Sequence, residues 1–288
     1  MPNISEQAMI ADHTQIPADV SIGAFSVVQE EVRLAADVRI GVGCVLERGV
    51  QIAAGCRLGH YVILGVGVCL GENCRVEDHS VIYAGTLLEE ECVIGSHASL
   101  GKRPQAAATS TLTVQDDLPA LSIGAGTVVG CGAVLYAGTH YGRKVFIGDA
   151  ARVREGCRIG DYVLIGGGVA VENDTRIGAY TKIQTGSYIT AHMEIAERVF
   201  IAPMVTTTND NYMGRTEKRL KLIQGARIAR GARIGGGSIL LPRVHVAEET
   251  FVAAGALVTK DTQAGRVVQG VPARDIRAVP LEEKLPPK

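Results

Sequence analysis

Tryptophan is absent from this 288-residue chain, and aromatic residues make up only 4% of it. Small and branched side chains must therefore fill most of the interior. The net charge is −1, so no basic excess points to nucleic acid or to an anionic membrane. No run approaches the length of a transmembrane helix, and the first nine residues lack the apolar core of a signal peptide. We expect neither feature.

What the chain does have is a period of six residues between Ile10 and Leu100. Every sixth residue of this stretch is aliphatic, without exception. Because 47% of all residues are apolar, chance would fill only about half of such a column. A fixed hexapeptide period predicts an all-β fold, the parallel β-helix, in which short strands alternate with corners.

Two positions of each hexad are expected to point inward. One is the aliphatic residue, and the other is a small or β-branched residue four places later, such as Val20, Cys44 or Ser80. The residue directly after the aliphatic one is often glycine, as in Gly23 and Gly59. We expect glycine there because a tight corner requires unusual backbone angles.

The period fails in two places, over residues 101–120 and 206–225. Between them Tyr141 is the single non-aliphatic residue of its column, which predicts a local bulge. Residues 1–9 read as a short lead-in. We therefore expect two loop excursions and four parts: an N-terminal β-helix block (1–105), an excursion (106–122), a C-terminal β-helix block (123–263) with a loop at 206–227, and a short irregular or helical tail (264–288).

Five of the seven cysteines occupy the small inward position, and Cys56, Cys74 and Cys92 are spaced by eighteen. We expect these three to stack on successive turns, about 4.8 Å apart, a spacing that does not exclude a disulfide. Reduced cysteine as small apolar filler is the favoured interpretation, and it implies a cytoplasmic location. No metal site is expected, since these thiols have no histidine partners. His79 and His97, also eighteen apart, should stack on an outer face.

The hexapeptide pattern resembles that of the hexapeptide-repeat acyltransferases. The resemblance implies three hexads per triangular turn, a left-handed coil, a homotrimer, and an acyl-thioester bound between neighbouring prisms. The left hand comes from the resemblance alone, because parallel crossovers are nearly always right-handed.

The segment that begins at Ile201 and ends at Arg215, IAPMVTTTNDNYMGR, is similar to the Thr-Asn-Asp-x-x-x-x-Arg loop of bacterial nucleotide-sugar N-acetyltransferases. That resemblance implies a nucleotide-linked amino sugar as substrate, with Asn209 and Asp210 as catalytic residues. Thr208, Tyr212 and Arg215 would then bind the substrate.

Related O-acetyltransferases carry a catalytic histidine where Asn209 stands. A hydroxyl needs a general base, whereas a neutral amine attacks a thioester without one. Asn209 then needs only to hydrogen-bond the substrate, and Asp210 to hold the ammonium or take its proton. The motif departs from its family in having Met-Gly where a single Pro usually precedes Arg215. The long first block is more like UDP-N-acetylglucosamine acyltransferases, which use a histidine base and an acyl chain on a carrier protein.

Three later runs, starting at Gly231, Val252 and Gly270, resemble the acetyl-CoA-binding end of hexapeptide acetyltransferases. The implied co-substrate is acetyl-CoA or another acyl-CoA, with no metal. The implied cofactor-binding residues are Gly235, Gly236, Ala253, Ala254, Lys260, Arg266 and Arg274.

Two histidines are further catalytic candidates. His192 lies eighteen residues before Asp210, so regular stacking would place it one coil below as a His–Asp base. His140 lies beside Tyr141 and Arg143, a cluster suited to a sugar or a phosphate. Three hypotheses remain: an acyl-CoA-dependent N-acyltransferase, an O-acyltransferase or acyl-carrier-dependent sugar acyltransferase with a histidine base, and a non-catalytic β-helix binding module.

Overall fold

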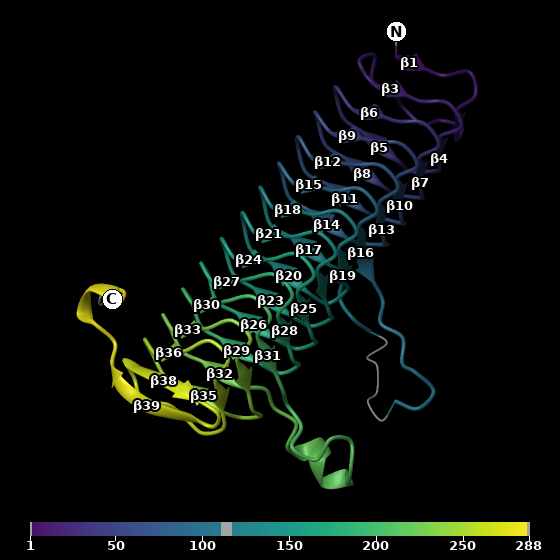
Figure 1. Ribbon diagram of the computed structural model, residues 1–288. Coiled ribbons are helices and arrows are strands. Elements are labelled where there is room, and N and C mark those ends of the chain that lie inside the picture. Colours follow the sequence, from purple (N-terminus) through teal and green to yellow (C-terminus); the bar gives the residue numbers. More distant parts are fainter. Residues whose placement is uncertain (1, 111–116, 287–288) are drawn as a thin grey trace. The chain divides into compact units, whose positions relative to one another are not determined.

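The computed structural model describes residues 2–110 and 117–286 of the chain (Figure 1). The chain divides into two compact units: unit 1 is Met1–Ala150 with Arg154–Gly156, and unit 2 is Ala151–Val153 with Cys157–Lys288. Both consist mainly of two-residue strands in parallel ladders, and none of the described residues is α-helical. The predicted all-β parallel β-helix is confirmed, while its left-handed sense stays a prediction.

Three ladders run through unit 1, and from β3 onward a strand pairs with the strand three places later in the chain, whereas β1 pairs with β3 and β2 with β4. The first holds β1 (Asn3–Ile4), β3 (Ser21–Ile22), β6 (Arg39–Ile40), β9 (Arg57–Leu58), β12 (Arg75–Val76), β15 (Val93–Ile94), β18 (Val128–Val129) and β21 (Phe146–Ile147). The second holds β2 (Met9–Ile10), β4 (Val27–Val28), β7 (Val45–Leu46), β10 (Ile63–Leu64), β13 (Val81–Ile82), β16 (Ser99–Lys102) and β19 (Val134–Tyr136). The third holds β5 (Arg33–Leu34), β8 (Gln51–Ile52), β11 (Cys69–Leu70), β14 (Leu87–Leu88), β17 (Ser122–Ile123) and β20 (His140–Tyr141).

Unit 2 repeats this arrangement. Its first ladder holds β24 (Leu164–Ile165), β27 (Lys182–Ile183), β30 (Phe200–Ile201), β33 (Arg233–Ile234), β36 (Phe251–Val252), β38 (Arg266–Gly270) and β39 (Ala273–Ala278). The second holds β22 (Arg152–Val153), β25 (Ala170–Val171), β28 (Tyr188–Ile189), β31 (Thr206–Thr207), β34 (Ile239–Leu240) and β37 (Leu257–Val258). The third holds β23 (Arg158–Ile159), β26 (Arg176–Ile177), β29 (Glu194–Ile195), β32 (Arg227–Ile228) and β35 (His245–Val246).

The inward positions are those that the hexad predicts. Within the uninterrupted coils, strand pairing places an aliphatic residue over the one eighteen earlier, as Leu64 over Leu46, and both are fully buried. At the small position a buried hydroxyl or thiol donates to the carbonyl fifteen residues later, Ser80 to Gly95 (2.8 Å) and Cys74 to Glu89 (3.1 Å). Such polar side chains enter the core with their hydrogen bonds made, whereas the buried hydroxyl of Thr86 has no partner among the described residues.

The predicted cysteine column is present in unit 1. All seven cysteines are free thiols. A hydrogen bond with the Cys74 thiol, together with burial, raises the pKa of Cys56 far above its usual range. Cys56, Cys74 and Cys92 are all fully buried, which agrees with the interpretation as apolar filler. The predicted stack of His79 on His97 is also confirmed, with ring centroids 4.9 Å apart.

The expected reason for the corner glycines is wrong. Positive φ occurs three residues after the aliphatic position, where Phe25 (60°), Tyr61 (56°) and many other non-glycine residues adopt it. Gly41, directly after its aliphatic residue, is required for another reason: a Cβ there would collide with the carbonyl group of Gly59 on the next coil. Close approach of two backbones, and not an unusual dihedral angle, selects glycine at this position.

The interruptions leave the ladders in register. After the first, Ile123 pairs with Leu88, although β16 shows a register shift against β19 between Leu100 and Lys102. The returning end of this excursion is anchored by Leu118, which is buried; residues 111–116 lie outside the described part. After the second interruption, Ile228 pairs with Ile195.

Both ends of the chain are more regular than the sequence indicates. The expected lead-in already forms β1 and β2, and β1 pairs with β3. The expected irregular or helical tail contains an antiparallel hairpin of β38 and β39, followed by the short 3-10 turn η2 (Leu281–Glu283).

Candidate functional site

The second interruption forms a loop that leaves unit 2 after β31 and contains the 3-10 helix η1 (Glu217–Lys221) (Figure 1). Its two ends meet where the backbone N–H of Gln224 donates to the carbonyl of Asn209 (3.1 Å). Beside this neck the Thr208 hydroxyl donates to the carbonyl of Leu240 (3.2 Å). The loop is thus closed at its base by the residues that the sequence motif singles out.

Asp210 organises the interior of this loop. Its carboxylate accepts backbone N–H groups from Tyr212 (2.8 Å) and Gly214 (3.0 Å), and it pairs with Arg219 (3.3 Å). The two backbone hydrogen bonds, followed by the arginine, lower the pKa of Asp210 below its ordinary value. A carboxylate held in this way is a poor proton acceptor at neutral pH, so the geometry favours a structural role over that of a base.

Asn209 differs from both of its neighbours. Its carbonyl closes the neck, yet its half-buried side-chain amide has no hydrogen-bond partner within the described residues. An amide offers two donors and one acceptor oxygen. At this neck Asn209 therefore presents hydrogen-bonding groups that the loop itself does not consume.

The remaining motif residues belong to the turn that Asp210 holds. Tyr212 is half-buried, and its carbonyl accepts the backbone N–H of Arg215 (3.0 Å), whose side chain is exposed. Tyr212 and Arg215 therefore lie within one turn, on the loop that begins at Asn209, as the motif requires.

His192 occupies a corner of unit 2, but its acidic partner differs from the predicted one. Its Nδ1 lies 3.7 Å from an oxygen of Asp174, eighteen residues earlier, and both side chains are over 40% exposed. Within the described chain no hydrogen bond or ion pair joins His192 to Asp210, because the Asp210 carboxylate is turned into its own loop. The loop exit is nevertheless close, since a Cβ on Gly225 would meet the side chain of Met193.

The other predicted cluster lies in unit 1. His140 and Arg143 are exposed, whereas Tyr141 is fully buried and pairs with Ile123 in unbroken register. The predicted bulge at Tyr141 is therefore wrong, and so is its role in substrate binding, because the core of the coil accommodates the ring and no surface of it is left for a ligand.

The small residues of the predicted CoA site gather at one corner of unit 2. A Cβ on Gly235 would collide with the backbone of Ala254, so glycine is required there by coil packing. Gly236 and Ala253 are half-buried, and Ala254 is exposed. Because its residues are glycine and alanine, this corner leaves the backbone accessible to a ligand, with few side-chain atoms covering it.

The three predicted phosphate-binding cations are not equivalent. Arg266 forms two contacts with the carboxylate of Asp275 (2.7 and 2.9 Å), and this hydrogen bonding raises the pKa of Arg266. Lys260 and Arg274 are exposed and have no acidic partner among the residues described. The charge of Arg266 is thus neutralised by Asp275, whereas the charges of Lys260 and Arg274 are available to an anion.

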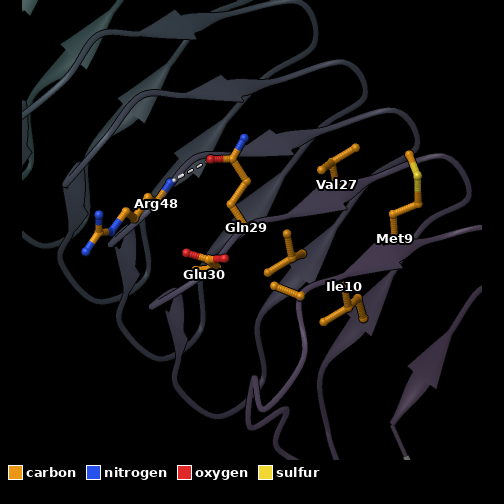
Figure 2. A pocket seen from close by; sticks show the side chains of 8 residues that line it. Met9, Ile10, Val27, Gln29, Glu30 and Arg48 are labelled. Atoms are coloured by element: carbon orange, nitrogen blue, oxygen red, sulfur yellow. Dashed lines mark hydrogen bonds between the residues drawn. The ribbon is translucent and has the colours of Figure 1, made fainter.

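Elsewhere, a hollow of about 520 Å³ lies near the start of unit 1, between the apolar side chains of Met9 and Val27 and the polar ones of Gln29, Glu30 and Arg48 (Figure 2). It contains none of the predicted site residues. Over the described ranges, no cluster of three or more His, Cys, Asp or Glu side chains is placed to hold a metal ion. No helix in the described part is long and apolar enough to cross a membrane.

No protein-family model matches the chain. A fission yeast protein named "Putative serine acetyltransferase" (Schizosaccharomyces pombe) is 39% identical over 89 residues. That match covers 30% of this chain and 32% of the yeast protein. The chain resembles the hexapeptide-repeat acyltransferases.

Two solved structures of such enzymes are also similar. UDP-N-acetylglucosamine acyltransferase of Francisella novicida is 17% identical, over 96% of this chain and 68% of that one, with a TM-score of 0.44. A maltose O-acetyltransferase of Clostridium difficile 630 is 22% identical, over 42% of this chain and 69% of that one, with a TM-score of 0.37.

Three residues around the loop are not among the sequence-predicted ones. Asp174 is spaced by eighteen from His192, so the period itself would have identified it. Arg219 and Gln224 close the loop from inside a non-periodic segment, where spacing carries no information.

Proposed function

We propose that this protein is an acyl-CoA-dependent N-acyltransferase that acylates the amino group of a nucleotide-linked amino sugar at the neck of the 206–225 loop. The observation that carries the proposal is the half-buried Asn209 side-chain amide, which has no hydrogen-bond partner among the described residues, whereas the side chains of its neighbours Thr208 and Asp210 are both engaged. The resemblance to an acetyltransferase and the Thr-Asn-Asp motif support the same reaction class.

The chemistry suits a site whose one carboxylate is a weak base. The neutral amine attacks the thioester carbonyl carbon, a C–N bond forms, the C–S bond breaks, and CoA leaves as a thiolate. The proton released from nitrogen passes to solvent or to the thiolate. Asn209 hydrogen-bonds the amine or the developing oxyanion, and both tasks require orientation and not proton transfer. Asp210 keeps the loop in shape and adds negative charge that favours the incoming ammonium.

We place the acyl-CoA at the corner of Gly235, Gly236, Ala253 and Ala254, where little side chain covers the backbone. Lys260 and Arg274 supply charge for its phosphates. The acyl group is taken as acetyl and the assembly as a homotrimer, both from the family resemblance. The free thiols support a reducing, cytoplasmic setting.

The test is the Asn209→Ala variant, assayed with acetyl-CoA and a panel of nucleotide-linked amino sugars. Because the amide acts on the reacting groups, we expect turnover to fall at least about tenfold. Asn211→Ala is the matched control, since this exposed neighbour lies in the same loop and should leave turnover unchanged. Equal turnover of Asn209→Ala and wild type would contradict the proposal, and no acetyl-CoA binding at millimolar concentration would favour a non-catalytic module.

A second candidate is O-acyl transfer with His192 as the base. It is favoured by the 3.7 Å approach of Asp174 to His192 near the loop exit. Matched amino and hydroxy sugars separate the two reactions, since only the hydroxyl needs a base. In this alternative His192→Gln abolishes acylation of the hydroxy sugar, and full activity of that variant rules His192 out as the base.

A further inference from the structure

One corner of unit 2 carries a stack of planar side chains. Tyr162, Tyr180 and Arg198 follow one another at intervals of eighteen residues. The two tyrosine rings are nearly parallel with centroids 4.9 Å apart, and the Arg198 guanidinium lies 4.7 Å from the centroid of Tyr180. All three side chains are on the outside of the coil, and the Tyr180 side chain is 46% exposed.

The adjoining sheet face completes a hollow. Lys182 and Phe200 are paired neighbours on β27 and β30 and point away from the core, and Phe200 is 40% exposed. Together with the tyrosine stack they line a concavity of about 320 Å³. That volume lies at the lower end of the range for small-molecule sites, roughly 300–1,000 Å³.

The charge in this hollow is positive and not neutralised from within. Neither Lys182 nor Arg198 forms an ion pair with any described residue. Glu197, which precedes Arg198, is directed instead to Arg230 (3.2 Å). Exposed aromatic side chains gathered in one place on a surface are a mark of a binding site, and here the two cations beside them add positive charge.

We propose that this hollow, lined by Tyr162, Tyr180, Lys182, Arg198 and Phe200, binds a nucleoside 5′-phosphate. The base lies against the aromatic side chains, where stacking tolerates any base. The phosphates meet Arg198 and Lys182, since guanidinium and ammonium groups recognise phosphate oxygens. The site does not use the loop residues, so it stands whether or not the chain transfers acyl groups. A free nucleotide and the nucleotide of a sugar nucleotide share the required chemistry.

The test is calorimetry of the full-length chain with UDP and ADP, at low and at moderate salt. We expect saturable binding of both, weaker as ionic strength rises. Uridine and ribose 5-phosphate should each bind at least about tenfold more weakly, because uridine lacks the phosphates and ribose 5-phosphate lacks the base. UDP-glucose, compared with UDP, distinguishes a sugar-nucleotide source from a free-nucleotide source.

Four variants locate the binding. Arg198→Gln and Lys182→Gln change only exposed side chains, and each should weaken UDP binding about tenfold with an unchanged melting temperature. Tyr180→Ala should do the same by removing the centre of the stack. Phe25→Ala removes an exposed aromatic side chain that has the same hexad position and positive φ in unit 1, and this variant should bind UDP like wild type.

Three outcomes overturn the proposal. One is the absence of saturable nucleotide binding at millimolar concentration. Another is binding that neither Arg198→Gln nor Lys182→Gln weakens. The third is a change of oligomeric state in Tyr180→Ala or Arg198→Gln with UDP affinity intact, which would assign this face to a contact between copies of the chain.

Discussion

Asp37 in the uninterrupted coils and Asp210 in the loop are chemically alike but do different things. Both pair with arginine, Asp37 with Arg57 at 2.7 Å and Asp210 with Arg219 at 3.3 Å, and hydrogen bonding lowers the pKa of both. Around Asp37 the backbone is already fixed by strand ladders on both sides. Around Asp210 no ladder exists, and the carboxylate itself holds two backbone N–H groups.

The difference separates the part of the molecule that specifies the fold from the part that is suited to chemistry. In the coils every strand is hydrogen-bonded to strands of the neighbouring coils, so a single side chain outside the core has little influence on the backbone conformation. In the loop a few local contacts determine the conformation. Binding and catalytic residues are often found on such loops, positioned by a rigid scaffold.

The largest effect is expected where two coils touch. Gly41→Ala places a Cβ against the carbonyl of Gly59. Because the strand ladders hold that carbonyl in place, we expect the free energy of unfolding to fall by about 1–3 kcal/mol. Gly67→Asn is the control: its corner is open and Asn73 has the same positive φ at an equivalent position, so the loss should stay below about 1 kcal/mol. Chemical denaturation measures both. Equal losses would show that dihedral angle, not close approach, selects glycine in the coils.

A smaller effect is expected from removing the two carboxylate charges. Asp210→Asn loses the arginine pair and weakens the backbone bonds of the loop, so trypsin should cleave within residues 215–221 several-fold faster, with little change in melting temperature. Asp37→Asn should leave the coils as resistant as before. If both variants gain the same sensitivity, the contrast between coil and loop is wrong.

Acid should have the effect of the Asp210→Asn variant without mutation. Because the folded-state pKa of Asp210 is lowered, its contribution is complete above the unfolded value of about 3.8 and is lost as pH falls through the folded value. Pepsin should therefore cut the loop only when the pH is below that of ordinary carboxyl titration. Cleavage beginning near pH 5 would show that another group holds the loop.

The smallest effect is expected in the cysteine column. Serine already occupies the same inward position at Ser26 and Ser80 and donates the same hydrogen bond to a carbonyl fifteen residues later. Cys74→Ser should therefore change the free energy of unfolding by no more than about 1 kcal/mol. A larger loss, measured by denaturation under reducing conditions, would mean that the thiol column contributes through sulfur packing.

The fold was predictable because it is repeated. One column of aliphatic residues from Ile10 to Leu100 reports the same environment many times, and spacing by eighteen correctly stacks Cys56 with Cys74 and His79 with His97. The same rule failed where a position is unique. Tyr141 fits a regular strand, and His192 meets Asp174 because Asp210 has left the coil. The loop contacts of Arg219 and Gln224 depend on local hydrogen bonds that no period encodes.

The corner residues with positive φ have a consequence for how such a chain diversifies. Tyrosine, histidine, asparagine and glutamate all adopt this backbone geometry in the present structure. The corner positions thus form rows with one residue per coil, and the backbone keeps the same geometry whichever of these residue types is present. The residues of one corner row can therefore be substituted one at a time without changing the fold, and the row of Tyr162, Tyr180 and Arg198 is an example of a surface built in this way.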